Sequence, residues 1–321
     1  MKYWASLLIV LLWACNSRET SLKNTASDIN EGISSQVSLI ILGTIQDAGS
    51  PHIGCKKACC ASLFITPDAT RKVVSLGVID KSTYETFLFE ATPDITSQLT
   101  DLKHFSNSES EMPNGIFLTH AHIGHYSGLM YLGKEAINAS DIPVYTMPKM
   151  TSYLEENGPW SQLVTNKNIS LVPIENKQHI ELTTNIRVTP FTVPHRDEFS
   201  ETVGFIIHGP NKKVLFIPDI DKWEKWETSI IEEISEVDYA FLDATFYDGD
   251  ELNTRDISEI PHPFIVESMQ LFETLPASEK EKIYFIHFNH TNPVLNSESE
   301  AYKKVLENGF NVSQYGQQLN L

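Results

Sequence analysis

The sequence predicts an α/β protein in which strands and helices form layers. Its 321 residues are 41% hydrophobic and 21% charged, which provides enough apolar side chains for a substantial core. Short apolar runs rich in β-branched residues recur along the chain, and segments with helical spacing lie between them. The sequence shows no internal repeat of fixed period. This mixed order of elements is typical of a layered α/β domain.

The N-terminal segment is expected to lie outside this domain. The stretch MKYWASLLIVLLWAC places Lys2 before an apolar run, residues 7–12, that is too short for a permanent membrane span. It resembles a bacterial lipoprotein signal peptide, residues 1–15, in which Cys15 becomes lipidated after cleavage. The alternative is an ordinary secretory signal with an incidental cysteine. The lipoprotein interpretation predicts an exported protein anchored to a membrane, on its periplasmic or cell-surface side.

The next segment, residues 16–36, is polar, contains no aromatic residue and has no periodicity, so we expect a flexible tether. A single folded domain is expected to span residues 37–321. It opens with residues 37–42, a continuous apolar run that ends at Gly43 and therefore indicates a buried strand. The long loop TIQDAGSPHIGCKKACC follows this strand.

The remaining elements follow from the hydrophobic pattern. Apolar or alternating runs predict strands, and apolar residues three or four positions apart predict helices. The turn Gly209-Pro210-Asn211 separates two of the strands. The expected strands are residues 73–78, 86–90, 115–118, 143–146, 186–193, 202–208, 213–218, 238–242 and 282–288. The expected helices are residues 95–105, 125–139, 148–157, 223–236, 263–275 and 297–308.

Three histidines stand together in FLTHAHIGHYSGL, directly after the expected strand 115–118. His120 and His122 would share one face of an extended segment, because side chains alternate along a strand. His125 follows at the start of the next expected helix. A divalent metal needs several neutral imidazoles that converge on one point. Since the chain has only 11 histidines, this clustering predicts a metal site.

Three further ionisable residues each follow an apolar run. His195 follows RVTPFTVP, Asp219 follows VLFIP, and His287 follows KIYFI. Each one alone is typical of a loop residue. Together they indicate polar side chains that rigid strands deliver to one edge of the protein, where sites commonly form.

This set resembles the signature of the metallo-β-lactamase superfamily: His-x-His-x-Asp-His, then a lone His, a bridging Asp and a final His. The resemblance covers residues 37–321 and implies a four-layer αβ/βα sandwich. It also implies one or two divalent metals (zinc, iron or manganese) in the active site, with the ligands His120, His122, His125, His195, Asp219 and His287.

The sequence departs from this signature at Gly124, where the family has an Asp that completes the second metal site. Glycine has no side chain that can coordinate a metal. We therefore expect an asymmetric site with one firmly held metal. The second metal would be weak, absent or completed by another group, for which Asp47 in the loop after the first strand is a candidate.

Three cysteines, Cys55, Cys59 and Cys60, lie in the loop segment GCKKACC. Because the adjacent Cys59 and Cys60 can bridge only with strain, we expect a tetrahedral structural zinc that takes one more ligand. His290 and His52 are the candidates. The branch of the superfamily related to the phosphodiesterase PhnP uses three cysteines and a histidine in a His-x-x-His pair, which favours His290. The alternative is one disulfide and one free thiol.

The segments LDATFY, PHPFIVESM and HFNHTNPVL also resemble PqqB, a pyrroloquinoline quinone biosynthesis protein. In PqqB the first histidine motif is degraded, whereas here it is largely kept. The chain therefore resembles PqqB without being PqqB itself. The superfamily resemblance implies a metal-dependent hydrolase in which activated water attacks an ester, a phosphodiester or an amide. Asp219 would bridge the metals or orient the site. His262 would protonate a leaving group or stabilise an oxyanion, with a plain loop residue as the alternative.

Two other functions stay open at this point. The PqqB resemblance implies an iron-dependent hydroxylase, for which a reduced second site would leave open coordination positions. A non-catalytic metal-binding or sensor protein is the third possibility. For the hydrolase, the expected partners are a small-molecule or peptide substrate and, through the lipid anchor, a membrane. The sequence does not give the oligomeric state.

The formal net charge of −18 argues against nucleic acid as a partner, because a phosphate backbone would be repelled by most of the surface. Arg196, next to His195, is a candidate clamp for an anionic substrate, although such an arginine more often belongs to a structural ion pair. Trp223 and Trp226 would lie on one face of an expected helix, where we expect core or lid packing.

Overall fold

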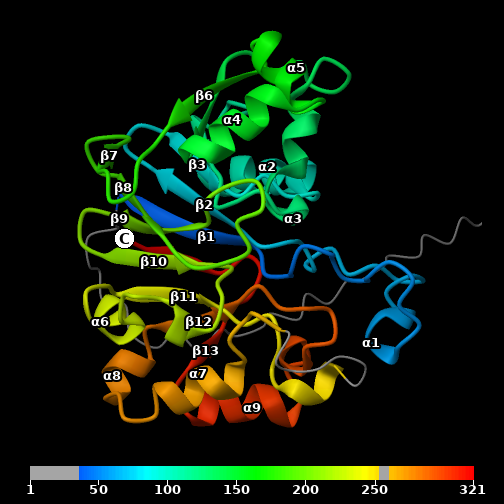
Figure 1. Cartoon of the computed structure of the whole chain (residues 1–321), viewed down its shortest axis with the longest axis vertical. Helices are drawn as coiled ribbons and strands as arrows, with labels where there is room; N and C mark the ends of the chain where they lie inside the picture. Colours follow the sequence, from blue (N-terminus) through cyan, green and yellow to red (C-terminus); the bar gives the residue numbers. More distant parts are fainter. Residues whose placement is uncertain (1–35, 253–259) are drawn as a thin grey trace, which may run out of the picture. The chain divides into compact units, whose positions relative to one another are not determined.

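Two mixed sheets lie at the centre of the computed structural model, which describes residues 36–252 and 260–321 (Figure 1). The predicted signal peptide with Cys15, and the tether up to residue 35, lie outside the described residues. Within the described ranges, no helix combines the length and apolarity needed to cross a membrane.

The first sheet is antiparallel from its first edge to the fourth strand and parallel from there to its second edge. Its seven strands are, in spatial order, β14 (Gln318–Asn320), β1 (Val37–Gly43), β2 (Ser75–Asp80), β3 (Glu85–Phe89), β4 (Gly115–Phe117), β5 (Ile142–Thr146) and β6 (Ile169–Pro173).

The second sheet has a similar plan, with three parallel pairings followed by three antiparallel ones. Its seven strands are, in spatial order, β13 (Asn311–Val312), β12 (Ile283–Ile286), β11 (Tyr239–Asp243), β10 (Lys213–Ile217), β9 (Val203–His208), β8 (Arg187–Thr192) and β7 (Ile180–Glu181).

Helices cover the outer faces of both sheets (Figure 1). The helices are α1 (Ala58–Ala61), α2 (Ile95–Ser106), α3 (Ile123–Tyr126), α4 (Pro148–Glu156), α5 (Trp160–Thr165), α6 (Ile230–Ser235), α7 (Ile265–Leu271), α8 (Ala277–Lys280) and α9 (Glu300–Glu307). The 3₁₀ turns are η1 (Ser127–Leu132), η2 (Trp223–Lys225), η3 (Gly249–Leu252) and η5 (Pro293–Leu295).

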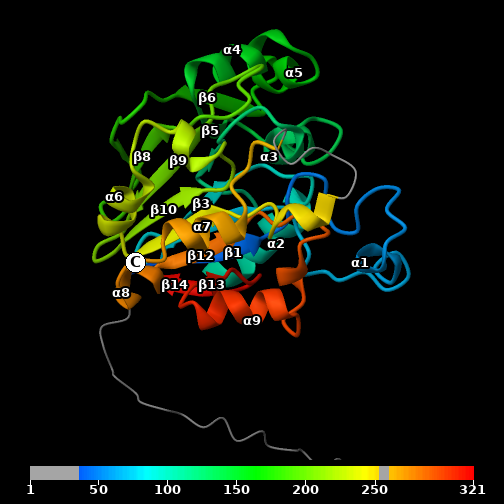
Figure 2. The same ribbon diagram turned by 60° about the horizontal axis from the view of Figure 1, so that its bottom comes forward.

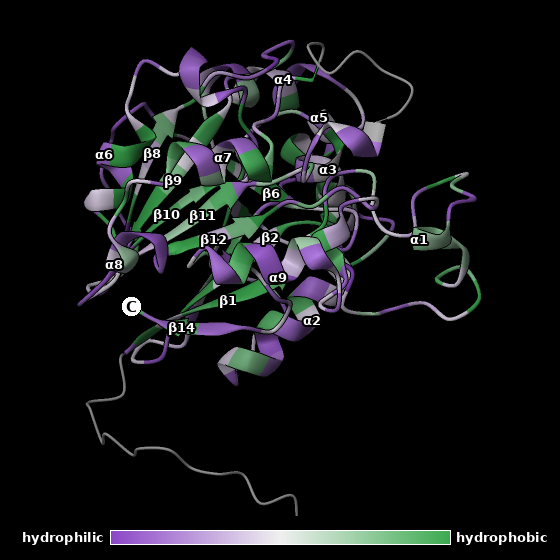
Figure 3. Ribbon diagram, turned by 90° about the horizontal axis from the view of Figure 1, so that it is seen from below, coloured by the Kyte–Doolittle hydropathy of each residue, from purple (hydrophilic) through white to green (hydrophobic). Residues whose placement is uncertain are grey.

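Three hydrophobic clusters join these layers. The inner cluster packs residues of the first sheet, such as Leu39 and Phe89, against residues of the second, such as Phe205 and Phe216. A second cluster lies between the first sheet and α2, η1, α4 and α5, and a third lies between the second sheet and α6, α7 and α9. The strands are correspondingly apolar (Figure 3). The expected αβ/βα sandwich is therefore confirmed.

Every expected strand is present, with small shifts at its ends. The expected helix 125–139 is wrong: the chain forms only the short α3 and then the 3₁₀ turn η1. The backbone N–H of Gly128 donates to the carbonyl of Ala91, at 2.9 Å, instead of continuing the helical ladder. The side chain of Ile137, which supported the helical spacing, is 47% exposed.

The expected helix 223–236 is also wrong, because it divides into η2 and α6. Trp226, just after η2, has an extended backbone, and its indole N–H donates to the carbonyl of Thr192 at 3.1 Å. Ser229 then starts α6 as an N-cap, since its hydroxyl accepts from the N–H of Glu232. Trp223 is buried in the core, and Trp226 packs against the same cluster.

Candidate metal centre

The candidate ligands all follow the carboxyl ends of strands. His120 and His122 come after β4, His195 after β8, Asp219 after β10 and His287 after β12. The two sheets meet at this edge, because Ile45, just after β1, forms a parallel bridge with Phe288. This meeting of strand ends brings residues that are distant in the sequence into one site.

The first group of candidate ligands contains His120, His122, His195 and Asp219, whose ligand atoms lie within 4.8 Å of one another. Nε2 of His120 and Nε2 of His195 lie 3.4 Å and 3.3 Å from Oδ2 of Asp219. His122 faces the same oxygen with Nδ1, at 3.9 Å. All four predicted residues therefore converge on one point.

The second group contains Asp47, His125, Asp219 and His287, again within 4.8 Å of one another. Oδ1 of Asp47 lies 3.1 Å from Nε2 of His125 and 3.1 Å from Nε2 of His287. Oδ2 of Asp219 lies 3.9 Å from Nε2 of His125. Asp219 thus belongs to both groups, as expected of a residue that bridges two metals.

Gly124 and Asp47 occupy the same space. A Cβ added at Gly124 would lie 2.6 Å from Cβ and 2.8 Å from Cγ of Asp47, distances that real Cβ atoms essentially never show. The absence of a side chain at Gly124 therefore makes room for Asp47. In the family signature, an Asp at this position supplies the carboxylate. Here Asp47, in the loop after β1, supplies it instead.

Four of the histidines direct Nε2 into the site, and three of them have a hydrogen-bond partner at Nδ1. His120 Nδ1 lies 2.8 Å from the hydroxyl of Thr119, His195 Nδ1 lies 3.2 Å from Asp221, and His287 Nδ1 lies 2.9 Å from the hydroxyl of Thr245. His125 Nδ1 lies 3.5 Å from the buried carboxylate of Glu90. Partners of this kind fix the orientation and tautomer of metal-ligating imidazoles.

The electrostatics of the site favour ionised carboxylates but differ among the histidines. Burial lowers the pKa of His120 well below its usual value, and the charge of His125 adds to this effect. Burial raises the pKa of Asp219, but the charges of His195 and His262 outweigh it and hold that pKa well below its usual range. Burial lowers the pKa of His125, but Asp47 and Glu90 outweigh it and raise that pKa well above its usual value, and Asp219 in the same way raises the pKa of His195 to about 9. A metal bound here would therefore displace protons from these imidazoles.

The ring of His262 lies beside Asp219 rather than in a remote loop. Its Nδ1 is 3.1 Å from Oδ1 of Asp219 and 2.9 Å from Oδ2 of Asp243. Burial lowers the pKa of His262, but Asp243 and Asp219 outweigh it and raise that pKa well above its usual value. His262, Asp219 and Asp243 also form a third, smaller group of potential metal ligands.

Sequence reasoning missed Asp243 and Glu90, although both carried the same signal as Asp219. Each stands at or just after the carboxyl end of an apolar strand, β11 for Asp243 and β3 for Glu90, and each is fully buried. Glu90 and His287 also have a positive φ, of 78° and 67°. Backbone conformations of this kind concentrate at functional sites.

The three cysteines form a separate group with His290, and the ligand atoms lie within 4.8 Å of one another. Cys55, Cys59 and Cys60 are free thiols. His52, the other candidate, instead stacks on the ring of His290, with 4.4 Å between the ring centroids. The geometry is thus that of a potential Cys₃His zinc site.

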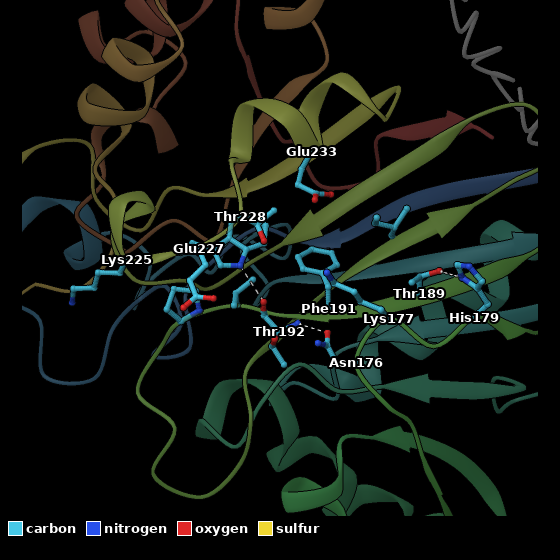
Figure 4. Close-up of a pocket in the computed structure, with 14 residues that line it drawn as sticks. Asn176, Lys177, His179, Thr189, Phe191, Thr192, Lys225, Glu227, Thr228 and Glu233 are labelled. Atoms are coloured by element: carbon cyan, nitrogen blue, oxygen red, sulfur yellow. Dashed lines mark hydrogen bonds between the residues drawn. The ribbon is translucent and has the colours of Figure 1, made fainter.

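Two other predicted features lie at the rim. Nη1 of Arg196 is 3.8 Å from Glu198, whose other oxygen is 3.3 Å from Nε2 of His122, so this arginine belongs to an ion pair. A cavity of about 750 Å³ lies beside β8, lined among others by Phe191, Trp226 and Lys177 (Figure 4). It contains none of the candidate ligands and comes closest to them along the chain at Val193 and Pro194.

The sandwich and its two groups of potential ligands at the strand ends define a protein of the metallo-β-lactamase fold. A family model described as "Beta-lactamase superfamily domain" matches residues 85–288, and the chain belongs to this family.

The similar proteins point to the PqqB and PhnP branch. The coenzyme PQQ synthesis protein B of Acinetobacter baumannii (strain SDF) is 24% identical over 310 residues, which span 88% of this chain and 99% of the relative. The corresponding protein of Klebsiella pneumoniae is 25% identical over 309 residues, spanning 88% and 97%.

Two solved structures share the fold. Zn²⁺-bound PqqB from Methylobacterium extorquens has a TM-score of 0.72 at 22% identity, and the match covers 88% of this chain and 100% of that one. A diphosphatase from the PhnP family has a TM-score of 0.60 at 20% identity, with 88% and 96% covered. The resemblance inferred from the sequence is confirmed.

Proposed function

We propose that the protein is a metal-dependent hydrolase whose centre holds two divalent metals. The observation that carries this proposal is that Asp219 belongs to two groups of four potential ligands. His120, His122 and His195 complete the first group, and Asp47, His125 and His287 complete the second. Zinc, iron and manganese all accept such donors.

The donor set fits metals better than it fits hydrogen bonds. Nε2 of His120 is buried and makes no hydrogen bond within the described residues, although Asp219 lies 3.4 Å away. A buried polar atom without a partner is costly, and a metal would satisfy it. The Nδ1 partners of His120, His195 and His287 point the remaining ring nitrogens at the same place, as outer-shell groups of metal sites do.

Metals bound at these two groups would activate a water molecule as a nucleophile and polarise the bond under attack. The protein's own residues do the rest. Asp219 belongs to both ligand groups and therefore links the two halves of the centre. His262, kept protonated by Asp219 and Asp243, offers Nε2 as a general acid to the leaving group.

The bond broken is an ester, a phosphodiester or an amide in a small molecule or a peptide. The similarity to a PhnP-family diphosphatase supports a substrate that carries a phosphoryl group. The argument for an iron-dependent hydroxylase was that the second site is incomplete. Asp47 lies between His125 and His287 and supplies the missing carboxylate, so this argument no longer applies. Intact ligand groups also speak against a non-catalytic protein.

We also propose that Cys55, Cys59, Cys60 and His290 hold a structural zinc. Three thiolates and one imidazole form a closed tetrahedral donor set with no open position for a substrate. The fold-level similarity to Zn²⁺-bound PqqB supports zinc in this branch of the superfamily.

A substrate panel tests the hydrolase. The purified protein, supplied in turn with zinc, manganese and ferrous iron, would be assayed on a carboxylic ester, a phosphodiester and an amide. We expect turnover of at least one class, and a loss of about 100-fold or more in Asp219→Asn, because a lost bridging ligand disrupts both groups. The exposed Asp141→Asn is the matched control. Equal rates in both variants would contradict the proposal.

A further inference from the structure

We infer that the cysteine site positions Asp47 and thereby controls how tightly the second metal is held. The inference rests on the proposed two-metal hydrolase and assigns the Cys55, Cys59, Cys60 and His290 group a role in its active centre. The metal at His125 and His287 would be retained fully only while the cysteine site is intact.

The two sites share the same two chain segments. The loop after β1 carries Asp47 and then all three cysteines. The turn after β12 carries His287 and then His290. Each site therefore joins the same loop to the same turn, the second metal group through Asp47 and His287, and the cysteine group through its thiols and His290.

Backbone hydrogen bonds fix this loop at its two ends, where the N–H groups of Thr44 and Ile45 donate to the carbonyl of Lys72. The N–H of Gln46 donates to the carbonyl of Phe288 at 2.9 Å, and the N–H of Phe288 donates to the carbonyl of Thr44 at 2.8 Å. Asp47 comes directly after this pairing. What holds its carboxylate therefore depends on the part of the loop that follows.

That part of the loop has almost no hydrophobic core. Between Ile45 and Val73, the only buried hydrophobic side chain is Cys60, while Ile53 and Ile65 are 84% and 85% exposed. The helix α1 stands away from both sheets at the outer end of the loop (Figures 1 and 2). Segments with so little apolar burial usually need a disulfide or a metal to stay ordered.

Because Gly124 stands where the family signature has an Asp, the second metal group depends on the order of this loop. In the signature, the second carboxylate stands on the same short segment as the histidines and needs no help from another loop. Here the space at Gly124 is taken by Asp47, so the carboxylate stands on the loop that the cysteines anchor. Of the ligands in the second group, Asp47 is the one that stands on the loop carrying the cysteines, while His287 shares its turn with His290.

The test replaces two thiols, with Cys59→Ser and Cys60→Ser combined, and uses Lys56→Ser in the same loop as the matched control. Protein freed of metal would be titrated with Co²⁺ and followed by visible absorption, since thiolate-bound Co²⁺ is spectrally distinct from Co²⁺ held by histidine and carboxylate. We expect two histidine-type equivalents in the wild type. In the double variant, the second of these should bind about 10- to 100-fold more weakly, the range typical of lost outer-shell support.

A background without the Asp47 carboxylate separates this effect from general unfolding. In the variant Asp47→Ala, the second group keeps His125, His287 and Asp219 but loses the carboxylate of this loop. Adding the two cysteine substitutions to this background should leave the second Co²⁺ affinity unchanged. A similar weakening in both backgrounds would overturn the positioning role, and so would equal second-site affinity in the wild type and the cysteine variant. A wild type without any histidine-type Co²⁺ would instead overturn the proposed hydrolase itself.

Discussion

At the scale of single residues, the pair Gly124 and Asp47 explains how this chain keeps a second metal group without the usual carboxylate. The two positions compete for one volume, since a Cβ on Gly124 would lie 2.6 Å from Cβ of Asp47. Asp47 in turn faces both His125 and His287 at 3.1 Å. A glycine at this position is thus a requirement of the site and not a sign of decay.

The substitution Gly124→Ala should therefore destabilise the protein. Overpacking of a closed site typically costs about 1–3 kcal/mol. Chemical denaturation would measure the loss in the free energy of unfolding. In the background Asp47→Gly the same alanine should cost less, but the relief should be partial, because Cα of residue 47 also lies 2.4 Å from the added Cβ. Additive effects of the two substitutions would contradict the shared volume.

The substitution His262→Gln should lower turnover without loss of metal. His262 lies beside Asp219 but has two carboxylates at Nδ1, which suits a proton donor rather than a ligand. General acid catalysis typically contributes about 10²- to 10⁴-fold, so kcat should fall within that range. Elemental analysis in parallel should show unchanged metal. If the metal content falls with kcat, His262 is a ligand instead.

At the scale of elements, apolar strands were predictable and so were the ligands at their ends. The runs before His195, Asp219 and His287 correspond to β8, β10 and β12. The strands β7, β13 and β14 span only two or three residues, too few for a periodic pattern to appear. The sequence predicts helices where the chain forms η1 and η2, because the backbone N–H of Gly128 donates to Ala91 and the backbone of Trp226 is extended.

The approach of Asp47 was the least predictable part of the site. Its loop has no hydrophobic period, so the sequence indicated only a candidate carboxylate near the first strand. The distance between Asp47 and His287 follows from the pairing of Ile45 with Phe288 across the two sheets. Such a long-range contact carries no local sequence signal.

The helix α9 offers a test of the fold that leaves the site untouched. Ser299 caps it, since the hydroxyl accepts from the backbone N–H of Tyr302 at 3.1 Å. Ser299→Ala should lower the free energy of unfolding by about 1 kcal/mol, as the loss of an N-cap usually does. Ser297→Ala, at an exposed position nearby, should have little effect. Metal content and turnover should not change in either variant.

At the scale of the whole molecule, the N-terminal segment carries a proposal of its own. The stretch before Cys15 resembles a lipoprotein signal, so we propose that the mature protein is exported and held on a membrane by a lipid at Cys15. The variant Cys15→Ser should move the protein from the membrane fraction to the soluble fraction. Mass spectrometry of the mature wild type should show a modified Cys15. An unmodified thiol there would end this proposal.

The central claim is that one chain holds a two-metal centre and a separate cysteine zinc site. Elemental analysis of the purified wild type, after equilibration with zinc and removal of the free metal, tests it most directly. The two histidine and aspartate groups that share Asp219, together with the cysteine group, predict about three zinc ions per chain. A variant that lacks Cys59 and Cys60 should lose the cysteine zinc and retain zinc at the histidine and aspartate groups. A single zinc that disappears in this variant would contradict the claim, because the histidine and aspartate groups would then hold no metal.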